Sequence, residues 1–298
     1  MELSVILCTY NPRADLLAEV MQALAQQTLS RERFEIVVVD NHSSPSVEVA
    51  EPGMEVRVVR EPTPGLNHAR RAGILATHAD LLVFVDDDNI LDSEYLQKAV
   101  DIARDNPSIG AFGGIARGRV EAGNIPQWKR RLLDKLGVRE IGDQVMTSAE
   151  DRWGPWEPIG AGMVVRKPVA TEFVKLIETV EDARRLDRSG ASGLMSGGDT
   201  LMARCAYRVG LACSYQPALK LTHVIKAGRL KMGYLLRILH GHGRSVVVLN
   251  RALGVPLRKM GVVELVLRAG YRLATRGVPG CIIYAWDWGY FLEGRVKK

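Results

Sequence analysis

The sequence predicts an α/β protein with a doubly wound, mostly parallel sheet, followed by a C-terminal helical segment. Short apolar runs at residues 3–9, 34–40 and 81–85 are bounded by polar residues, which is typical of strands buried on both faces of a parallel sheet. Segments with an apolar period of 3.6 residues lie between them. Such strand–helix alternation with short connections favours parallel strands joined by helices.

The elements can be assigned in chain order. The expected strands of the first part are residues 3–9, 34–40, 56–61 and 81–85. The expected helices are residues 15–27 after the turn at Pro12, a Gly-initiated helix within 64–78, and residues 94–103. Right-handed crossovers then bring the carboxyl ends of the strands to one edge of the sheet.

The pattern changes after Asp105. Residues 110–118 are Gly-rich and compact, residues 153–168 combine two tryptophans with a strand, and the Gly- and Ser-rich residues 185–199 predict a mobile loop. The expected elements that follow are a helix closed by Gly210, a strand at 211–215, a segment at 216–224, and basic helices from Gly228 onward.

Composition describes an ordinary globular protein. The chain has 298 residues, 47% of them hydrophobic and 25% charged, which is enough for one extended domain or two. Its four cysteines are scattered without CxxC spacing, so neither a zinc site nor a disulfide framework is expected, and Cys8 reads as a core residue. Because we find no secretory leader and no apolar run long enough to span a bilayer, we expect a cytoplasmic protein.

The net charge of +6 is unevenly distributed. Residues 226–298 carry 14 Lys and Arg against three acidic residues, whereas the preceding part is net negative. Such a tail suits an anionic partner, either a membrane surface or a nucleic acid. It lacks the interleaved aromatic platform of single-strand binders, so no nucleic acid is expected.

Three adjacent carboxylates, Asp86, Asp87 and Asp88, follow the strand at 81–85 directly. Side chains alternate along a strand, so Asp86 and Asp88 would point the same way if the extended path continued. Converging carboxylates at the carboxyl edge favour a divalent cation, and the alternative is that one of them caps the next helix. Thr9 and Asp40 follow strands at the same edge, while the GxGxxG and GxxxxGK[ST] phosphate loops do not occur.

Six motifs together resemble family 2 glycosyltransferases. They are SVILCTYNP, VVVD, GLNHARRAG, FVDDDN, GGD followed five residues later by Arg204, and YQP with His223. The resemblance covers about residues 3–225 and implies the GT-A fold, in which a nucleotide-sugar-binding half (1–118) is merged with an acceptor-binding half (119–225). Residues 226–298 lie outside it and form a basic, helical extension.

The resemblance implies roles for individual residues in donor binding. Thr9, Tyr10 and Asn11 would line the nucleoside pocket, and Asp40 would accept a hydrogen bond from the base. From its own chemistry, Asp40 could equally cap a turn. The other implied donor contacts are Arg70, Asp86 and Asp87, and the implied ligands of Mn²⁺ or Mg²⁺ are Asp88, Asp86 and His223. A lone Arg on a helix is more often solvated, and a lone His in an apolar segment is more often structural.

Asp199 takes the position of the family's catalytic base. Relatives often have Glu-Asp here, so Gly198 predicts that an acid pair raising the pKa of the base is absent. The alternative role of Asp199 is an N-cap of the following helix. Trp153, Trp156 and Arg204 are candidate acceptor contacts, although tryptophan is as often a core residue. The Gly- and Ser-rich stretch before Asp199 would be a lid.

The expected function is a metal-dependent inverting glycosyltransferase that moves one sugar from a nucleotide-diphosphate donor, by family a UDP-sugar, to a glycan or lipid-linked acceptor. The QxxRW motif of processive synthases is missing. The alternatives are a nucleotidyltransferase and a non-catalytic assembly module with the same fold.

The basic tail admits two interpretations. Arg268, Arg272 and Arg276 recur every four residues, and Arg237, Arg244, Arg251 and Arg258 recur every seven, so each set lies near one side of a helix. We expect a cationic amphipathic helix on the inner face of an anionic membrane. The alternative is a set of helices that pack as ordinary structure.

Overall fold

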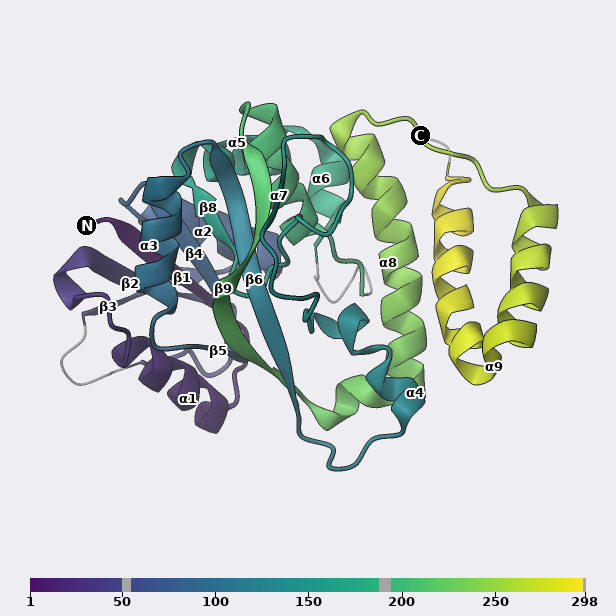
Figure 1. The fold of residues 1–298 in the computed structure, drawn as a ribbon, viewed down its shortest axis with the longest axis horizontal. Coiled ribbons are helices and arrows are strands. Elements are labelled where there is room, and N and C mark those ends of the chain that lie inside the picture. The colour runs from purple at the N-terminus through teal and green to yellow at the C-terminus, as the bar shows by residue number, and fades with distance from the viewer. Residues whose placement is uncertain (50–54, 188–193, 297–298) are drawn as a thin grey trace. The chain divides into compact units, whose positions relative to one another are not determined.

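The computed structural model describes residues 1–49, 55–187 and 194–296, and within them nine strands form one sheet (Figure 1). Their order is β3-β2-β1-β4-β8-β6-β9-β5, with β7 paired to β9. The strands are β1 (Leu3–Thr9), β2 (Phe34–Asn41), β3 (Val56–Glu61), β4 (Leu81–Asp86), β5 (Asn89–Leu91), β6 (Ile109–Val120), β7 (Met146–Ser148), β8 (Val164–Arg166) and β9 (Ala212–Ile225).

The helices of the described residues alternate with these strands in the first part of the chain. The α-helices are α1 (Ala14–Ala25), α2 (Leu66–Ala76), α3 (Tyr95–Asp105), α4 (Gln127–Arg130), α5 (Lys167–Thr179), α6 (Glu181–Arg185), α7 (Gly198–Arg208), α8 (Met232–Leu253) and α9 (Val262–Glu293). Short 3₁₀ helices are η1 (Arg31–Arg33), η2 (Leu133–Leu136) and η4 (Ala227–Leu230).

The parallel α/β arrangement is confirmed in the first half of the sheet. β1 pairs in parallel with both β2 and β4, so that Leu3 lies opposite Phe34 on one side and Leu81 on the other. β2 pairs in parallel with β3. Beyond β4 the sheet becomes antiparallel, because β8 pairs with β4 and β6, and β9 pairs with β5 and β7. The sheet is therefore mixed.

Helices cover both faces of the parallel strands, which explains their continuous apolar sequences. Leu3, Val5 and Leu7 of β1 join a buried core with residues of α1 and α3. Ile6 points to the opposite face, where α2 comes so close that a methyl group at Gly73 would lie 2.3 Å from Ile6 Cγ2. Each fully buried Val, Leu or Ile contributes about 1.5–3 kcal/mol relative to exposure.

Two segments differ from the sequence-based assignment. Residues 110–118 lie within the strand β6, where Gly114 allows close approach to β9, since a methyl group there would lie 2.1 Å from the Leu219 carbonyl oxygen. Residues 211–215 and 216–224 join in the single long strand β9, which continues through Pro217. Gly210, with φ of 75°, ends the preceding helix as expected.

The contacts divide the chain into two compact units that interleave along the sequence. The first contains residues 1–119, 137–175 and 199–225, and therefore nearly the whole sheet. The second contains residues 120–136, 176–198 and 226–298. Residues 120–136 and 176–198, which we expected in the acceptor half, thus group with the C-terminal helices.

Helices α8 and α9 form the body of the second unit. Gly277 has non-helical backbone angles (φ 55°, ψ −134°) and divides α9 into two segments, residues 262–276 and 278–293. Figure 1 shows these segments as antiparallel helices with the second one beside α8. A methyl group at Gly243 would lie 2.0 Å from the Trp286 carbonyl oxygen, so small residues let these helices approach closely. None of the described helices is long and apolar enough to cross a membrane.

Candidate active site

Residues at the carboxyl ends of β1 and β4 meet at one edge of the sheet. The Thr9 hydroxyl donates a 2.6 Å hydrogen bond to Asp87 Oδ2. The charges of Arg70, Asp86 and Asp87 all act on the buried thiol of Cys8, whose pKa burial raises to about 12. Arg70 is itself buried, with 5% exposed, and is not the solvated surface arginine of the alternative interpretation. The Thr9 and Asp87 side chains are thus in contact, and Arg70 and Asp86 lie close enough to Cys8 for their charges to act on its thiol.

The aspartates do not follow the extended path that side-chain alternation assumed. β4 ends at Asp86, and Asp87 and Asp88 form a turn before β5, so the condition under which Asp86 and Asp88 would point the same way is not met. The turn is fixed because Val224 N–H donates to the Asp88 carbonyl oxygen at 2.9 Å and Thr9 holds the Asp87 side chain.

Asp88 and His223 form a buried pair. Asn89 of β5 lies opposite His223 of β9, which places Asp88 Oδ1 3.5 Å from His223 Nε2. The other ring nitrogen, Nδ1, lies 3.3 Å from the Gly137 carbonyl oxygen, and Asn89 Nδ2 donates to Asp88 Oδ1 at 3.0 Å. The two exposed fractions are 3% and 6%. Nothing in the sequence around Asp88 or His223 indicated this contact. The family resemblance did, because it implied that both residues bind one metal.

This pair suits a divalent cation that takes only part of its coordination from the protein. The described residues contain no group of three or more His, Cys, Asp and Glu side chains suited to a metal, so Asp86 does not complete a cage with Asp88 and His223. Magnesium, however, is commonly held by one or two carboxylates with phosphate oxygens and waters in the remaining positions. Asp88 and His223 would suit a metal whose coordination a bound diphosphate completes.

Asp40, at the end of β2, is engaged by its own loop. Ser43 N–H donates to Oδ1 at 2.9 Å and Val47 N–H donates to Oδ2 at 3.1 Å. Burial raises the pKa of this carboxyl, but the hydrogen bonds from Ser43 and Val47 outweigh burial and leave the pKa below its usual value. The structure thus shows the turn-capping alternative. A carboxylate can accept further hydrogen bonds, so contact with a nucleotide base stays a prediction.

Two asparagines tie the loops around this edge together. Asn11, with φ of 45°, donates its N–H to Ser43 Oγ at 2.9 Å and accepts from Ser44 N–H at 2.9 Å. Asn41 accepts from Gly65 N–H at 2.7 Å, which fixes the start of α2. Tyr10, next to Asn11 in the chain, is 60% exposed and open to a ligand. The role of Asn41 was missed from the sequence because it depends on a contact 24 residues away.

Asp199 lies in the first turn of α7, beside Gly160. Gly160 N–H donates to Asp199 Oδ2 at 3.2 Å, and Thr200 N–H donates to Oδ1 at 3.0 Å. A methyl group at Gly160 would lie 2.9 Å from Arg70 Nη2 and 3.3 Å from Asp199 Oδ2. Arg70 and Asp199 therefore flank the same glycine. Because α7 begins at Gly198, Asp199 lies inside its first turn and not at the N-cap position of the alternative interpretation.

A second carboxylate stands near Asp199, contrary to expectation. Glu157 is 4% exposed and accepts a 3.2 Å hydrogen bond from Arg204 Nε. Burial raises the pKa of Glu157 to about 7; Arg204 opposes this, and the negative charge of Asp199 adds to it. A loop before β8 thus supplies a second carboxylate near Asp199, which was not predicted from the sequence. That no acid raises the pKa of the base itself stays a prediction. A Glu inside the apolar run WEPIG was the available signal, since buried Glu is rare unless paired.

The three residues predicted to contact the acceptor, Arg204, Trp156 and Trp153, differ in how far their side chains are free to bind a ligand. Arg204 is 6% exposed, bound to Glu157, and 3.6 Å from Asp151, so its guanidinium is already engaged by protein carboxylates. Trp156 donates its Nε1–H to the Tyr207 hydroxyl at 3.0 Å, and the Arg152 guanidinium lies 4.6 Å from its ring centre. Trp153 is 75% exposed, which leaves its ring free to stack on a sugar.

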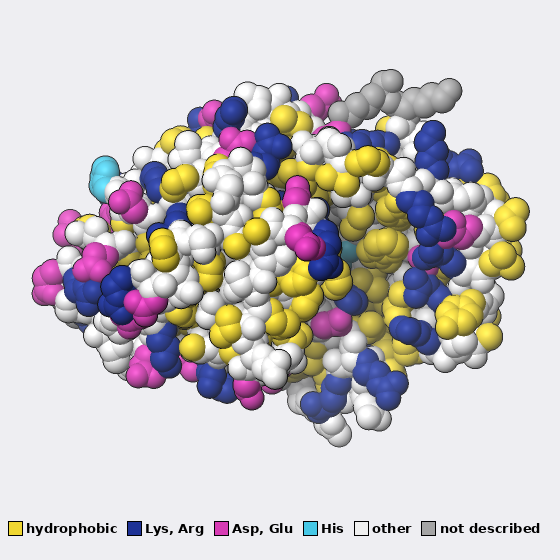
Figure 2. All heavy atoms as spheres, turned by 45° about the horizontal axis from the view of Figure 1, so that its top comes forward, with side chains coloured by type: hydrophobic (Ala, Val, Ile, Leu, Met, Phe, Trp, Pro, Cys, Tyr) yellow, Lys and Arg dark blue, Asp and Glu magenta, His cyan; other side chains and the backbone are white. Residues whose placement is uncertain are grey.

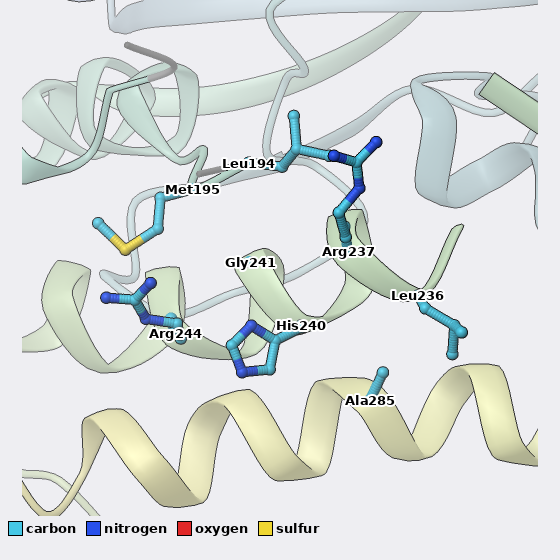
Figure 3. A pocket seen from close by; sticks show the side chains of 8 residues that line it. All are labelled: Leu194, Met195, Leu236, Arg237, His240, Gly241, Arg244 and Ala285. Carbon is cyan, nitrogen blue, oxygen red and sulfur yellow. The ribbon is translucent and has the colours of Figure 1, made fainter. Parts of the chain in front are cut away.

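A cavity of about 340 Å³ lies within the second unit (Figure 3). Leu194 and Met195, just before α7, line it together with α8 and with Ala285 of α9; Arg237, His240 and Arg244 add cationic or titratable groups. Ser196 N–H donates to Ser245 Oγ at 2.9 Å, which anchors this stretch to α8. Within the predicted lid, residues 185–199, this bond holds Ser196, while residues 188–193 lie outside the described residues.

Comparison with known proteins gives a family match. The model of the family described as glycosyl transferase family 2 matches residues 4–172, more than half of the chain. An uncharacterized glycosyltransferase of Haemophilus influenzae is 34% identical over 109 residues, 36% of this chain and 36% of that protein. The succinoglycan biosynthesis protein ExoM of Rhizobium meliloti is 28% identical over 138 residues, 44% and 43% of the two chains.

A third relative and one solved structure extend the comparison. The poly(ribitol-phosphate) beta-glucosyltransferase of Bacillus spizizenii is 30% identical over 125 residues, 39% of this chain and 20% of that protein. The matches thus span less than half the length of these relatives. The crystal structure of S. aureus TarS has a TM-score of 0.50 and 16% identity, covering 98% of this chain and 54% of that one, which shows a shared fold.

Proposed function

The chain belongs to glycosyl transferase family 2, and we propose that it is a metal-dependent inverting enzyme that transfers one sugar from a nucleotide-diphosphate donor to an acceptor hydroxyl. One observation carries this proposal: the buried Arg70 lies near both parts of the site. Its charge acts on Cys8 together with those of Asp86 and Asp87, and its guanidinium flanks Gly160 with Asp199. A group that holds anions and a candidate base are therefore adjacent.

The donor would bind along the carboxyl edge. The base and ribose would lie over the loops joined by Asn11 and Ser43, next to Tyr10 and Asp40. The diphosphate would lie beside the buried Arg70 guanidinium, which pairs well with phosphate oxygens. Asp88 and His223 would hold Mn²⁺ or Mg²⁺, which when bound neutralises charge on the diphosphate. UDP is the nucleotide that the resemblance implies.

Transfer would be a single displacement. The acceptor hydroxyl oxygen forms a bond to the anomeric carbon of the sugar, and the bond from that carbon to the diphosphate oxygen breaks. The hydroxyl proton passes to Asp199, and the nucleoside diphosphate leaves with the bonding electrons, so the configuration at the anomeric carbon inverts. General-base assistance of this kind contributes about 10²–10⁴-fold. The Gly160 and Thr200 N–H groups orient the Asp199 carboxylate.

Glycan assembly is the process that the relatives favour. Two of them are named for succinoglycan biosynthesis and for glucosylation of poly(ribitol phosphate). We therefore propose a hexosyl or related transfer to a glycan or lipid-linked acceptor, with Trp153 stacking on an acceptor sugar. The cavity of the second unit combines apolar and cationic side chains, which suits an amphiphilic anion such as a lipid-linked acceptor. The buried Glu157 near the half-buried Asp199 favours an enzyme over a non-catalytic module.

A thermal-shift screen of nucleotide-diphosphate sugars, with Mn²⁺, with Mg²⁺ and with chelator, tests the donor class. A ligand that binds the folded state raises Tm. We expect at least one nucleotide sugar to raise Tm, and to raise it more with metal than with chelator. If every nucleotide sugar leaves Tm unchanged under all three conditions, the proposed donor site is wrong.

A further inference from the structure

The first segment of α9, residues 262–276, buries charged side chains against its neighbour. Arg268 Nη1 donates to Asp287 Oδ1 at 2.9 Å, and Arg272 also binds the Asp287 carboxylate, which is fully buried. Glu264 accepts from Arg268 at 2.8 Å. A methyl group at Gly280 would lie 2.0 Å from the Arg272 carbonyl oxygen, so the two segments are in close contact. The inner side of this helix is therefore ionic.

Its outer side is apolar. At 100° per residue, the residues that point outward fall within one half of the helix circumference, and the ionic residues fall within the other. The exposed fractions of the outer residues are 52% for Val262, 73% for Val263, 63% for Val266, 68% for Leu267, 67% for Tyr271 and 59% for Leu273. Surface helices of water-soluble proteins have the reverse polarity, and a contiguous apolar face of this kind marks an interaction surface. Figure 2 shows hydrophobic side chains gathered over α9, with Lys and Arg beside them.

The charged residues around this face favour an anionic partner. In the described part of the tail, the acidic side chains are Glu264, Asp287 and Glu293, and each is bound to arginine and at most 29% exposed. The exposed charged residues are cationic, among them Lys259, which precedes the segment by three residues, and Arg276 at its end. A second copy of the chain would bring like charges together, whereas anionic lipid headgroups would complement them.

We propose that the outer face of residues 262–276, defined by the six exposed residues above, binds the surface of an anionic lipid bilayer, with its apolar side chains at the boundary of headgroups and acyl chains. The surface differs from the one that arginine periodicity suggested. Arg268 and Arg272 hold the hairpin together, and the membrane contact is made by the opposite side of the same helix. This inference concerns attachment and is independent of the sugar-transfer chemistry.

Vesicle co-sedimentation of the full chain tests the proposal. The variant is Val263→Glu with Leu267→Glu, two exposed positions whose change spares the Asp287 ion pairs. The control is Val58→Glu with Leu75→Glu, also exposed apolar positions, which lowers the net charge equally. We expect the wild type and the control to bind vesicles that contain phosphatidylglycerol, and to bind neutral phosphatidylcholine vesicles far less. Because removing two apolar side chains from the lipid boundary costs several kcal/mol, the apparent affinity of the variant should fall at least about tenfold.

Binding is measured without donor, so its failure is distinct from failure of the proposed reaction. Equal vesicle affinity of the variant and the wild type would overturn the proposal, as would equal binding to neutral vesicles. Sedimentation velocity tests for self-association. If the wild type does not bind vesicles but forms a dimer, and the variant stays monomeric, the proposal is overturned and the face is an interface between copies.

Discussion

Individual side chains at the candidate site are held by neighbours that come from distant parts of the sequence. Gly160 is an example, since its N–H orients Asp199 and its missing side chain leaves room for the Arg70 guanidinium. Glu157 is another, because it holds Arg204 and places a second carboxylate near the candidate base. The chemistry proposed here needs these groups to be oriented before substrate binds.

Replacement of Asp88 tests the metal pair at this scale. Asp88→Asn should remove the Mn²⁺-dependent part of the affinity for nucleoside diphosphate and abolish turnover, with little change in Tm. His223→Ala should weaken the same affinity more mildly, because water and phosphate oxygens can complete the coordination. Calorimetric titration with Mn²⁺ and with chelator measures both. Asp92→Asn, at an exposed position nearby, is the control. An Asp88→Asn protein with normal turnover in the presence of chelator would contradict the metal assignment.

The pH dependence of stability tests the burial of Glu157. Its pKa is raised from 4.5 to about 7 in the folded protein, so between these values the folded state binds more protons than the unfolded state. The stability that the neutral form contributes is complete below the unfolded pKa and is lost as pH rises through about 7. Between about pH 4 and pH 8, the free energy of unfolding of the wild type should fall by on the order of 3 kcal/mol relative to Glu157→Gln. Urea unfolding of both proteins measures this, and a constant difference contradicts the raised pKa.

At the scale of elements, apolar runs predicted the parallel strands well. β1, β2, β3 and β4 lie within a residue of their expected bounds, because strands buried on both faces need apolar side chains at every position. β6 was missed because it contains four glycines, which local propensity assigns to turns. The turn at Asp87 and Asp88 was missed because it depends on pairing with β9, about 135 residues later.

Glycine positions in α8 give a matched test of helix packing. Gly243→Ala places a methyl group 2.0 Å from the Trp286 carbonyl oxygen and should destabilise the protein by roughly 1–3 kcal/mol through overpacking. Gly233→Ala in the same helix meets nothing within 4 Å and should be neutral or stabilising by up to about 1 kcal/mol. Urea unfolding of the two variants checks this, and equal effects would rule out the close packing of α8 on α9.

Across the whole molecule, charge was the feature whose meaning changed most between sequence and structure. The arginine periodicity of the tail correctly placed Arg268 and Arg272 on one side of a helix, but could not say whether that side faces inward. This side faces inward, because Arg268 and Arg272 bind Asp287, and a fully buried carboxylate requires cationic partners. Arg244 and Arg251 likewise bind the buried Glu293, so for these residues the ordinary packing alternative describes the structure.

The central claim is that this chain transfers sugar with Asp199 as the base. Its most direct test is release of nucleoside diphosphate from a panel of nucleotide sugars with Mn²⁺, comparing the wild type with Asp199→Asn. Asn keeps the size of Asp and an oxygen that can accept a hydrogen bond from Gly160 or Thr200 N–H, so the variant should keep the Tm and the donor Kd of the wild type. Its release rate should fall by about 10²-fold or more. Release at the wild-type rate by the variant, or no release from any donor by the wild type, would contradict the account.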